Sequence, residues 1–274
     1  MRIAVTGATG LVGQFIVAGA LAAGHQVVAL GRSPSPHGGE HRPWTFHDPA
    51  PFDDCDALVH AAFAHVPGRY RGGEGDDPAG FLRTNLDGTL RLFEEARGRR
   101  TVFLSSRAVY DGFPAGSLLT EDLPLAPDSL YGQVKLRAEE ALASLGGTSL
   151  RATGVYGPPA PGQRHKWADL FDSFAQGGEI APACGTEVHG ADLARAVLLL
   201  LDAAPGAYNC SDLVLDRRDL LDRWSGITGV EGQRPAASVK VPNVMDCARL
   251  RALGWTPGGE VALDQTLRAL AGAG

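Results

Sequence analysis

Short apolar runs and longer apolar stretches alternate along the first half of the chain. The runs at Ile3–Thr6, Gln26–Leu30 and Ala57–Ala62 have the length and composition of buried strands. Between the first two lies Leu11–Ala23, an apolar stretch that predicts a helix, with Gly24 as its stop signal. Strands that alternate with helices at this spacing predict βαβ units and a parallel sheet buried on both faces.

The same alternation continues beyond residue 80. Buried strands are predicted at Thr101–Ser105 and Thr148–Ala152. Helices are predicted at about Phe81–Arg97 and Tyr131–Leu145. The sequence therefore predicts an α/β fold with a doubly wound parallel sheet.

Two stretches interrupt this pattern, and the composition changes after Gly154. Ser33–Pro51 and Val66–Pro78 are rich in proline or glycine, and strand signals resume directly after each, so both predict surface loops. A helix is predicted after Asp192 and a strand at Ala207–Cys210. We therefore expect the last third of the chain to form a smaller lobe whose segments interleave with the sheet.

Composition and charge exclude several classes of protein. Of the 274 residues, 44% are apolar and 20% are charged, which is typical of a globular protein with a sizeable core. The formal net charge of −6 provides no basic footprint for nucleic acid. The longest apolar run, Ala196–Leu201, is far shorter than the roughly 20 residues that cross a bilayer. Met1 and Arg2 lead directly into the first strand, so no signal peptide is predicted and a cytoplasmic location is expected.

Neither the cysteines nor the remaining polar residues predict a metal site. The four cysteines are far apart and form no CxxC pair, so we expect reduced, buried thiols at Cys55, Cys184, Cys210 and Cys247. His189 and Asp192 suggest a metal pair, but Asp192 opens an apolar helix, so an N-cap is the better interpretation. Trp224 and Trp255 are expected to pack in the core or the lobe.

A glycine-rich turn follows the first strand, where residues 6–13 read Thr-Gly-Ala-Thr-Gly-Leu-Val-Gly. In this strand–turn–helix context, Gly7 can make the tight turn and Gly10 can admit a pyrophosphate close to the backbone. Gly13 lets the helix pack against the strand, and the helix N-terminus then faces the anion. A plain turn that needs glycine for its backbone angles is the alternative. We predict a dinucleotide cofactor bound by Gly7, Thr9, Gly10, Leu11, Val12 and Gly13.

The end of the second strand bears on the choice of cofactor. NAD enzymes usually place Asp or Glu there, where it accepts hydrogen bonds from the ribose 2′-hydroxyl. This chain has Gly31 at that place, followed by Arg32 and Ser33. A guanidinium suits a 2′-phosphate through its charge and its forked donors, so NADP is favoured over NAD. The alternative is that Arg32 only solvates a surface loop.

Three residues form a candidate catalytic set. Ser106 closes a strand, and Tyr131 and Lys135 stand four positions apart on a predicted helix, so their side chains point into the same space. A neighbouring ammonium favours the phenolate and lowers the tyrosine pKa from its usual value of about 10. Tyr131 could then carry a proton to or from a substrate oxygen that Ser106 holds through its hydroxyl. An ordinary surface pair on a helix is the alternative for Tyr131 and Lys135.

With the glycine turn, these residues make the chain resemble the extended short-chain dehydrogenase/reductases, the NAD-dependent epimerase/dehydratase-like family. The resemblance covers nearly the whole length. Its motifs are the TGxxGxxG turn at 6–13, HAA at 60–62, NLDGT at 85–89, LSSRAVY at 104–110, PDSLYG at 127–132 with Lys135, and segments 151–158, 188–194 and 253–257. It implies a Rossmann-type fold, with residues 1–153 and about 186–211 in the dinucleotide-binding domain. Residues at about 154–185 and 212–274 are expected to form a small substrate lobe.

The resemblance implies catalytic roles for individual residues. Tyr131 is the expected acid/base, Lys135 its pKa partner and a ligand of the nicotinamide ribose, and Ser106 the hydroxyl that polarises the carbonyl. Asn85 is expected to help hold the active-site helix and the proton relay, with a helix-capping amide as the alternative.

Three further positions match places where the family contacts its cofactor. Asp48 matches the loop after the third strand of the family's fold, where adenine is often contacted, and a simple turn residue is the alternative. Ala61 and Ala62 would let the cofactor pass close to the backbone, with apolar core as the alternative.

Arg107, Tyr156 and Arg164 are weaker candidates for contacts with the substrate. Family members that dehydrate a nucleotide sugar carry Asp-Glu after the catalytic hydroxyl, and this chain has Arg107 and Ala108 there, so dehydration is disfavoured. Arg107 is expected to meet either an anionic substrate group or a surface acid. Arg164 and Lys166 lie in a basic cluster after Tyr156, in a region expected over the nicotinamide, and solvated loop charge is the alternative.

These expectations give one leading function and two alternatives. The leading function is an NAD(P)-dependent oxidoreductase that transfers hydride between nicotinamide and a carbonyl or secondary alcohol, with sugars and nucleotide sugars among the candidate substrates. The first alternative is an NAD-dependent sugar epimerase with internal hydride return, and the second is a non-catalytic NADP(H)-binding regulatory protein. We expect a small-molecule partner, with neither nucleic acid nor membrane. The family commonly dimerises through the helices predicted at Phe81–Arg97 and Tyr131–Leu145, so a homodimer is expected.

Overall fold

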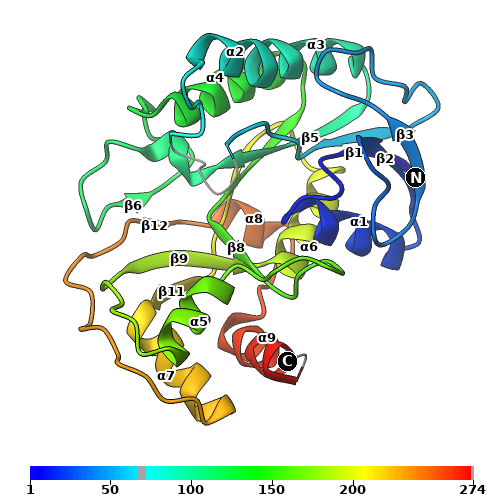
Figure 1. Cartoon of the computed structure of the whole chain (residues 1–274). Coiled ribbons are helices and arrows are strands. Elements are labelled where there is room, and N and C mark those ends of the chain that lie inside the picture. Colours follow the sequence, from blue (N-terminus) through cyan, green and yellow to red (C-terminus); the bar gives the residue numbers. More distant parts are fainter. Residues whose placement is uncertain (67–71, 273–274) are drawn as a thin grey trace.

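A seven-stranded parallel sheet forms the centre of the computed structural model, which describes residues 1–66 and 72–272 (Figure 1). The strands follow the order β10-β7-β5-β4-β1-β2-β3, and all of their pairings are parallel. They are β1 (Arg2–Thr6), β2 (Gln26–Gly31), β3 (Glu40–Pro43), β4 (Ala57–His60), β5 (Arg100–Ser106), β7 (Thr148–Ala152) and β10 (Gly206–Cys210). The order runs outward from β1 in both directions, so the prediction of a doubly wound fold is confirmed.

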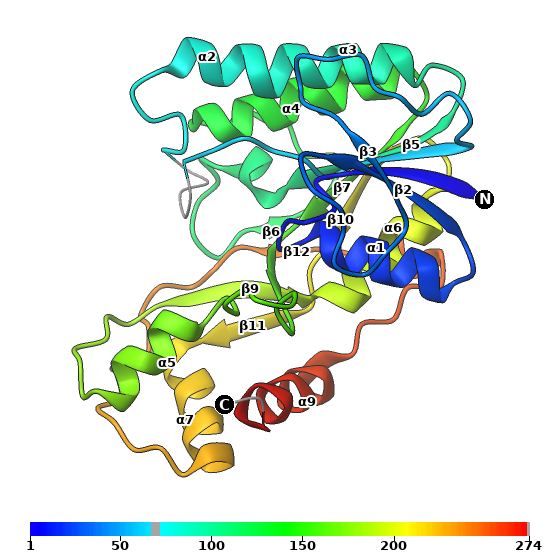
Figure 2. The same ribbon diagram turned by 45° about the vertical axis from the view of Figure 1, so that its right-hand side comes forward.

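Helices cover both faces of this sheet (Figures 1 and 2). One face carries two helices that pack against each other, α1 (Gly13–Ala22) and α6 (Gly190–Leu200). The other face carries α2 (Pro78–Leu82), a π-helical turn (Arg83–Asp87), α3 (Gly88–Glu95) and α4 (Leu130–Ser144). The predicted helix at Phe81–Arg97 is therefore a continuous helical segment with one wider turn inside it.

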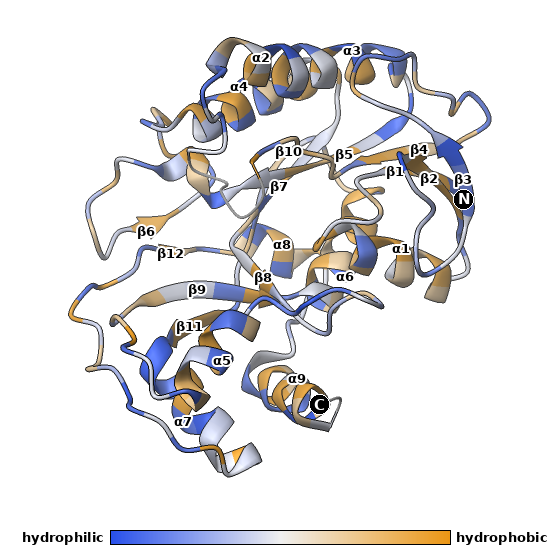
Figure 3. Cartoon of the chain, in the orientation of Figure 1, coloured by the Kyte–Doolittle hydropathy of each residue, from blue (hydrophilic) through white to orange (hydrophobic). Residues whose placement is uncertain are grey.

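Each central strand divides its side chains between two cores. In β1, Ile3 and Val5 face the core under α1 and α6, whereas Ala4 faces the opposite core together with Leu30 and Trp44. The three β1 residues are fully buried, because both faces of the sheet are covered. This explains why the neighbouring strands β1, β2 and β4 are largely apolar in the sequence. Figure 3 colours each residue by its hydropathy.

The prediction of a loop over the whole of Ser33–Pro51 is wrong at β3. Residues Glu40–Pro43 form a short edge strand that pairs in parallel with β2. Polar side chains hold it, because Arg42 pairs with Glu40 (2.7 Å) and with Asp54 (2.7 Å). A strand of this composition has no apolar periodicity, so the pattern of the sequence could not reveal it.

The second predicted loop, Val66–Pro78, agrees with the structure where the structure describes it. Residues 67–71 of this stretch lie outside the described residues. Residues 72–76 form turns, and α2 begins at Pro78. The Asp77 carboxylate accepts a hydrogen bond from the Gly80 N–H (2.8 Å) and so caps this helix.

A smaller lobe lies below the carboxyl edge of the main sheet (Figure 2). Its sheet has the order β11-β9-β8, from β8 (Gly154–Tyr156), β9 (Cys184–His189) and β11 (Leu213–Asp216). Its helices are α5 (Ala168–Ala175), α7 (Arg217–Thr228) and α9 (Gly259–Gly272). The lobe has its own apolar cluster, formed by Tyr156, Trp167, Phe171, Phe174, Ile180, Leu220, Leu221, Leu263 and Leu267. The domain boundaries given above stay predictions.

The two tryptophans named above pack as expected. Trp224 stacks on Phe171 in the lobe, with ring centroids 4.2 Å apart and nearly parallel planes. Trp255 is buried in the core of the main sheet, and its indole N–H donates to the Asp192 carbonyl (2.8 Å). Both side chains therefore stabilise the fold.

The prediction that Asp192 is the N-cap of its helix is wrong. The N-cap of α6 is His189, whose Nδ1 accepts a hydrogen bond from the Ala191 N–H (3.2 Å). Asp192 lies inside the first turn, and its buried carboxylate accepts from the Gly258 N–H (2.8 Å). This carboxylate fixes the segment that leads into α9.

Two small elements join the lobe to the main sheet. The strands β6 (Leu118–Leu119) and β12 (Val244–Met245) pair in parallel, and α8 (Ala248–Ala252) packs against β10. Across residues 1–66 and 72–272, none of the helices has the length and apolar character needed to cross a membrane.

Candidate active site

The glycine turn, the two alanines and Ser106 gather at the carboxyl edge of the main sheet. The glycine turn follows β1, Ala61 and Ala62 follow β4, and Ser106 ends β5. The strands β1 and β4 are neighbours, and the chain order reverses between them. In doubly wound sheets this reversal opens a crevice in which ligands bind.

The glycine turn leaves no room for side chains at two of its positions. Gly7 has φ of +71°, and a Cβ there would lie 2.7 Å from the Ala62 nitrogen. A Cβ on Gly13 would lie 2.0 Å from the Gly7 carbonyl oxygen. In this described part of the chain, Val12 precedes α1 without a side-chain cap, and the first turn of the helix carries no acidic residue. A narrow backbone cradle at an uncapped helix N-terminus fits the pyrophosphate of a dinucleotide.

A buried hydrogen-bonded chain lies beneath this cradle. The Thr6 Oγ1 accepts hydrogen bonds from the N–H groups of Ala61 and Ala62 (both 3.2 Å) and is bonded to His60 Nδ1 (2.7 Å). The other ring nitrogen, Nε2, is bonded to Thr89 Oγ1 (2.9 Å). Burial lowers the pKa of His60 to about 3, so the imidazole is neutral at ordinary pH. The chain therefore fixes the two alanine amides with neutral groups.

The candidates for the adenosine end of the cofactor lie on the surface. Arg32 and Ser33 are exposed directly after β2. Asp48 is exposed in the turn after β3, where its carboxylate accepts a hydrogen bond from the Thr45 hydroxyl (2.6 Å). Asp48 thus has the local bond of a turn residue, and its contact with adenine stays a prediction.

Ser106 lies at the point where β5 turns into a short 3₁₀ helix, Arg107–Tyr110. Its Oγ accepts a hydrogen bond from the Ala108 N–H (3.2 Å), which leaves the hydroxyl proton for a further acceptor. The first turn of α4 packs against this 3₁₀ helix, and a Cβ on Gly132 would lie 2.6 Å from the Ala108 carbonyl oxygen. Gly132 therefore allows the beginning of α4, with Tyr131, to approach the end of β5.

Tyr131 and Lys135 lie on one face of α4, as their spacing predicts. The phenol ring of Tyr131 meets Phe63 edge to face, with centroids 5.0 Å apart. The Lys135 Nζ is 5.8 Å from the centre of the Tyr131 ring and donates a hydrogen bond to the Leu104 carbonyl (2.8 Å). It also lies 4.6 Å from the ring centres of both Phe63 and Phe103.

The electrostatic state of Lys135 follows from this environment. The side chain is only 3% exposed, and burial lowers its pKa to about 7. The Glu139 carboxylate acts in the opposite direction and raises this pKa. A role for this ammonium in favouring the phenolate of Tyr131 stays a prediction.

Asn85 lies in the π-helical turn and is almost fully buried. Its side chain bonds both backbone groups of Ala64, accepting from the N–H (2.7 Å) and donating to the carbonyl (2.8 Å), and it also donates to the Phe81 carbonyl (3.1 Å). Asn85 therefore links the loop after β4 to the helix that packs on α4. A part in a proton relay stays a prediction.

The three weaker substrate candidates lie in different environments. Arg107 opens the 3₁₀ helix directly after Ser106. Tyr156 is fully buried in the lobe, where it stacks on Trp167 with centroids 5.2 Å apart. Arg164 is exposed and pairs with Asp169 (2.9 Å) and Asp172, both in α5. Their contacts with a substrate stay predictions.

Sequence reasoning gave no role to three residues that shape the site. His60 had a signal, because it is the one imidazole within a predicted buried strand. Gly132 had a signal in its place beside Tyr131 in the matching motif. Phe63 had none, because the packing of a loop aromatic on Lys135 depends on how that loop folds back.

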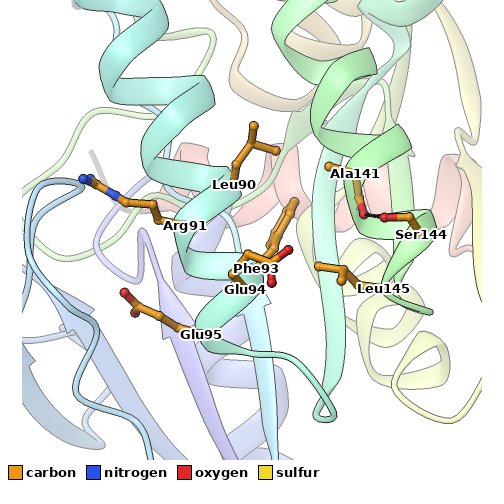
Figure 4. A pocket seen from close by; sticks show the side chains of 8 residues that line it. All are labelled: Leu90, Arg91, Phe93, Glu94, Glu95, Ala141, Ser144 and Leu145. Carbon is orange, nitrogen blue, oxygen red and sulfur yellow. Dashed lines mark hydrogen bonds between the residues drawn. The ribbon is translucent and has the colours of Figure 1, made fainter.

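A groove of about 470 Å³ lies away from this site, at the opposite end of α4 from Tyr131 (Figure 4). It runs between the C-terminal parts of α3 and α4. The residues that line it are Leu90, Arg91, Phe93, Glu94, Glu95, Ala141, Ser144 and Leu145. The groove belongs to the outer helical face and not to the carboxyl edge of the sheet.

The fold and the glycine cradle define a Rossmann-type protein, and comparison with known proteins identifies its family. The model of the NAD dependent epimerase/dehydratase family matches residues 3–211. The chain belongs to this family, and the resemblance to extended short-chain dehydrogenase/reductases is confirmed. It is thus a member of a family of enzymes.

Two of the curated relatives carry names of different activities. The chain is 32% identical to UDP-glucose 4-epimerase of Mycolicibacterium smegmatis over 183 residues, which are 58% of this chain and 57% of that protein. It is 30% identical to dTDP-6-deoxy-L-talose 4-dehydrogenase (NAD(P)(+)) of Kitasatospora kifunensis over 181 residues, 59% of this chain and 54% of that protein. The matched part of the chain thus spans little more than half the length of these curated relatives.

A solved structure agrees with the fold over the whole chain. UDP-glucose 4-epimerase of Thermus thermophilus, in complex with NAD, is 26% identical and superposes with a TM-score of 0.80, covering 100% of both chains.

Proposed function

We propose that this protein is an NAD-dependent epimerase that acts on a nucleotide sugar and returns the hydride internally. The main support is the whole-length similarity to an epimerase that was solved with NAD, combined with Ser106, Tyr131 and Lys135 at the carboxyl edge of the sheet. The relative with 32% identity carries the same printed activity. This makes the epimerase preferable to the net oxidoreductase that the sequence alone favours.

The residues of the cradle fit the cofactor. Gly7, Thr9, Gly10, Leu11, Val12 and Gly13 would hold the pyrophosphate, with Ala61 and Ala62 along its path. Lys135 and Tyr131 would contact the nicotinamide ribose. A bound nicotinamide dinucleotide supplies the site with a reversible hydride acceptor.

The residues of the chain supply the proton chemistry. The Tyr131 phenolate takes the proton of a substrate hydroxyl while that oxygen accepts a hydrogen bond from Ser106. The Lys135 ammonium stabilises the phenolate from the same face of α4. When the carbonyl is reduced again, Tyr131 returns the proton to the same oxygen. No net proton or hydride is consumed in an epimerisation. The site must therefore hold both until the keto-sugar has rotated to present its other face to the hydride.

A net NAD(P)-dependent oxidoreductase is the second candidate. Arg32 after β2 favours it, because an exposed guanidinium at the end of this strand suits a 2′-phosphate. The 30% identity to a sugar dehydrogenase that uses NAD(P)(+) supports the same candidate. A non-catalytic NADP(H)-binding protein is less well supported, because such a protein needs only the cradle and not the Ser106, Tyr131 and Lys135 set.

One experiment separates these candidates. One portion of the purified protein is denatured and the released nucleotide is identified. A second, native portion is supplied with that nucleotide and incubated with UDP-galactose. Bound NAD and the formation of UDP-glucose without added reductant support the epimerase. Weakly held NADP(H), together with reduction of added NADP⁺ to NADPH in proportion to an oxidised sugar product, supports the oxidoreductase and contradicts the epimerase. Nucleotide binding without turnover of any sugar nucleotide supports the regulatory protein.

We also propose a homodimer that works in the cytoplasm and forms through the outer face of α3 and α4. The groove in Figure 4 supports this interface, because Leu90, Phe93, Ala141 and Leu145 give it an apolar lining. Light scattering during size-exclusion chromatography measures the oligomeric state. A monomer at micromolar concentration contradicts this part of the proposal.

A further inference from the structure

A buried ion pair lies directly beyond Lys135 on α4. The side chains of Glu139 and Arg151 are 7% and 5% exposed. Arg151 donates from Nε and a terminal nitrogen to Glu139, with distances of 2.7 to 3.1 Å. The Ser105 hydroxyl also donates to this carboxylate. The Glu139 side chain is therefore held in one geometry by two different strands, β5 and β7.

The arginine extends this network across the sheet. A second terminal nitrogen of Arg151 donates to the Tyr110 hydroxyl (2.7 Å) and to the Glu121 carbonyl (3.2 Å). The Tyr110 hydroxyl donates in turn to Asn209 Oδ1 (2.8 Å) in β10. The ion pair is thus locked from both sides, and neither charged side chain can turn away without breaking several bonds.

The position of Glu139 relative to Lys135 is fixed by the helix. Four residues separate them, which is one helical turn, so they occupy one face of α4 together with Tyr131. The other groups around Lys135 are the rings of Phe63 and Phe103 and the Leu104 carbonyl.

The titratable groups near Lys135 come from three elements. Glu139 and Tyr131 lie on α4, the neutral His60 lies on β4, and Arg151 on β7 stands behind Glu139. Of these groups, Glu139 carries the negative charge that acts on Lys135.

Stability alone does not account for a buried ion pair at this place. Taking two charges out of water costs about as much as their attraction returns, and apolar pairs of similar size are often as stable. The pair therefore points to an electrostatic effect on the neighbouring Lys135. Burial between two aromatic rings lowers the pKa of Lys135, and Glu139 opposes that effect.

We propose that Glu139 is a positioning residue for the reaction: its carboxylate, clamped by Arg151 and Ser105, favours the ammonium form of Lys135 inside an aromatic pocket, so that Lys135 can stabilise the Tyr131 phenolate. Arg151 sets the strength of this effect, because it partly neutralises the carboxylate from the far side. The catalytic meaning rests on the proposed function, whereas the electrostatic coupling can be measured without substrate or cofactor.

The sequence makes this measurement simple, because its lysines are Lys135, Lys166 and Lys240. The full chain is labelled with ¹³C-lysine, and the pH titration of the Lys135 Cε signal is followed by NMR, with the Lys135→Met variant giving the assignment. We compare Glu139→Gln, Arg151→Met and the double variant. Glu140→Gln is the matched control, since it removes an exposed carboxylate one residue further along α4.

The two single variants should shift the titration in opposite directions. Glu139→Gln should lower the Lys135 midpoint by about one pH unit or more, and Arg151→Met should raise it. A merely structural role would loosen the pocket in both variants and raise both midpoints toward that of a free lysine. Glu140→Gln should leave the midpoint unchanged.

The double variant keeps the proposal testable if a single variant does not fold, because it leaves no charge unpaired. Its midpoint should lie below that of the natural protein, since Glu139 stands one helical turn from Lys135 and raises its pKa, whereas Arg151 acts from β7 through Glu139. A midpoint at or above the natural value in Glu139→Gln or in the double variant overturns the proposal. Such a result would leave the epimerase assay unaffected, so failures of the two proposals can be told apart.

Discussion

The cofactor side and the catalytic side of the candidate site are held in place by different kinds of interaction. On the cofactor side, Thr6, His60 and Thr89 form a neutral chain that fixes the amides after β4. On the catalytic side, Glu139 and Arg151 form a charged pair beyond Lys135. Both clusters are buried, and both connect neighbouring strands to a helix.

This difference indicates what each side requires. A cradle for an anion needs exact backbone positions, and neutral hydrogen bonds provide these without adding a net charge. A proton-transferring phenol needs a controlled charge beside it, which a neutral chain cannot supply. The comparison predicts that the cradle responds mainly to shape, and the catalytic side mainly to charge.

The largest effect is expected on the catalytic side. Tyr131→Phe removes the proton-carrying oxygen but keeps the ring that packs on Phe63. The turnover number for interconversion of UDP-glucose and UDP-galactose should fall by about 10²- to 10⁴-fold. The affinity for NAD, measured by calorimetry, should change little. Unchanged turnover would show that another group carries the proton.

The cradle should respond to one added methyl group. Gly13→Ala places a Cβ 2.0 Å from the Gly7 carbonyl oxygen, so either the turn or the helix must move. We expect a loss of about 1–3 kcal/mol in the free energy of unfolding and an NAD affinity at least about tenfold lower. The control is Gly226→Ala in α7, where a Cβ meets nothing within 4 Å. An NAD affinity equal to that of the natural protein would argue against the glycine turn as the pyrophosphate site.

The neutral chain should fail in acid. Because the pKa of His60 is about 3 in the folded protein and 6.5 in the unfolded chain, the unfolded chain takes up the proton first as the pH falls. The stability that His60 contributes is therefore present above pH 6.5 and is lost between about pH 6.5 and 3, by at most about 1.4 kcal/mol per pH unit. Urea unfolding of the natural protein and of His60→Gln at pH 7 and pH 5 measures this. Equal losses in the two proteins would contradict the assignment.

On the catalytic side, Lys135 should make stability depend on pH in the alkaline range. Its pKa is also lowered, to about 7 from 10.5, so the stability that it contributes should rise as the pH increases from 7 to about 10. Lys135→Met should flatten that rise, as measured by the same urea series at pH 7 and pH 9. A rise of equal size in Lys135→Met would mean that other groups cause it.

The smallest effect is expected at the edge of the cradle. Arg32→Ala should reduce the ratio of NADPH to NADH affinity by about tenfold, because it removes one charge-assisted contact with a 2′-phosphate. Fluorescence titration with both nucleotides measures the ratio, and Arg164→Ala is the control with an exposed arginine in the lobe. If the natural protein binds NADH better and Arg32→Ala changes nothing, Arg32 only solvates its loop.

The sequence predicted the elements that are encoded by local patterns. Buried strands such as β1 (Arg2–Thr6) and β2 (Gln26–Gly31) were found to within one residue of their observed bounds, because apolar runs under two helical layers have a clear pattern. β3 was missed because ion pairs hold its polar residues. The N-cap of α6 was placed three residues late, because His189 is an unusual cap and Asp192 a common one.

The site was predictable where a motif carries it and unpredictable where packing does. The glycine turn and the spacing of Tyr131 and Lys135 are visible in the sequence alone. The pairing of Glu139 with Arg151 joins residues 12 positions apart on a helix and a strand, so it appears only when α4 lies on β7. The contact of Phe63 with Lys135 likewise depends on the path of a loop.

The π-helical turn at Arg83–Asp87 has a consequence for how related sequences are aligned. A π turn accommodates one additional residue, so every side chain of α3 is rotated by about 100° relative to its phase in an uninterrupted helix. Deleting one residue from this turn would therefore keep the helix but swing the Asn85 amide away from the Ala64 backbone. Relatives that lack one residue in this turn should also lack the asparagine. The additional residue and the asparagine should therefore occur together.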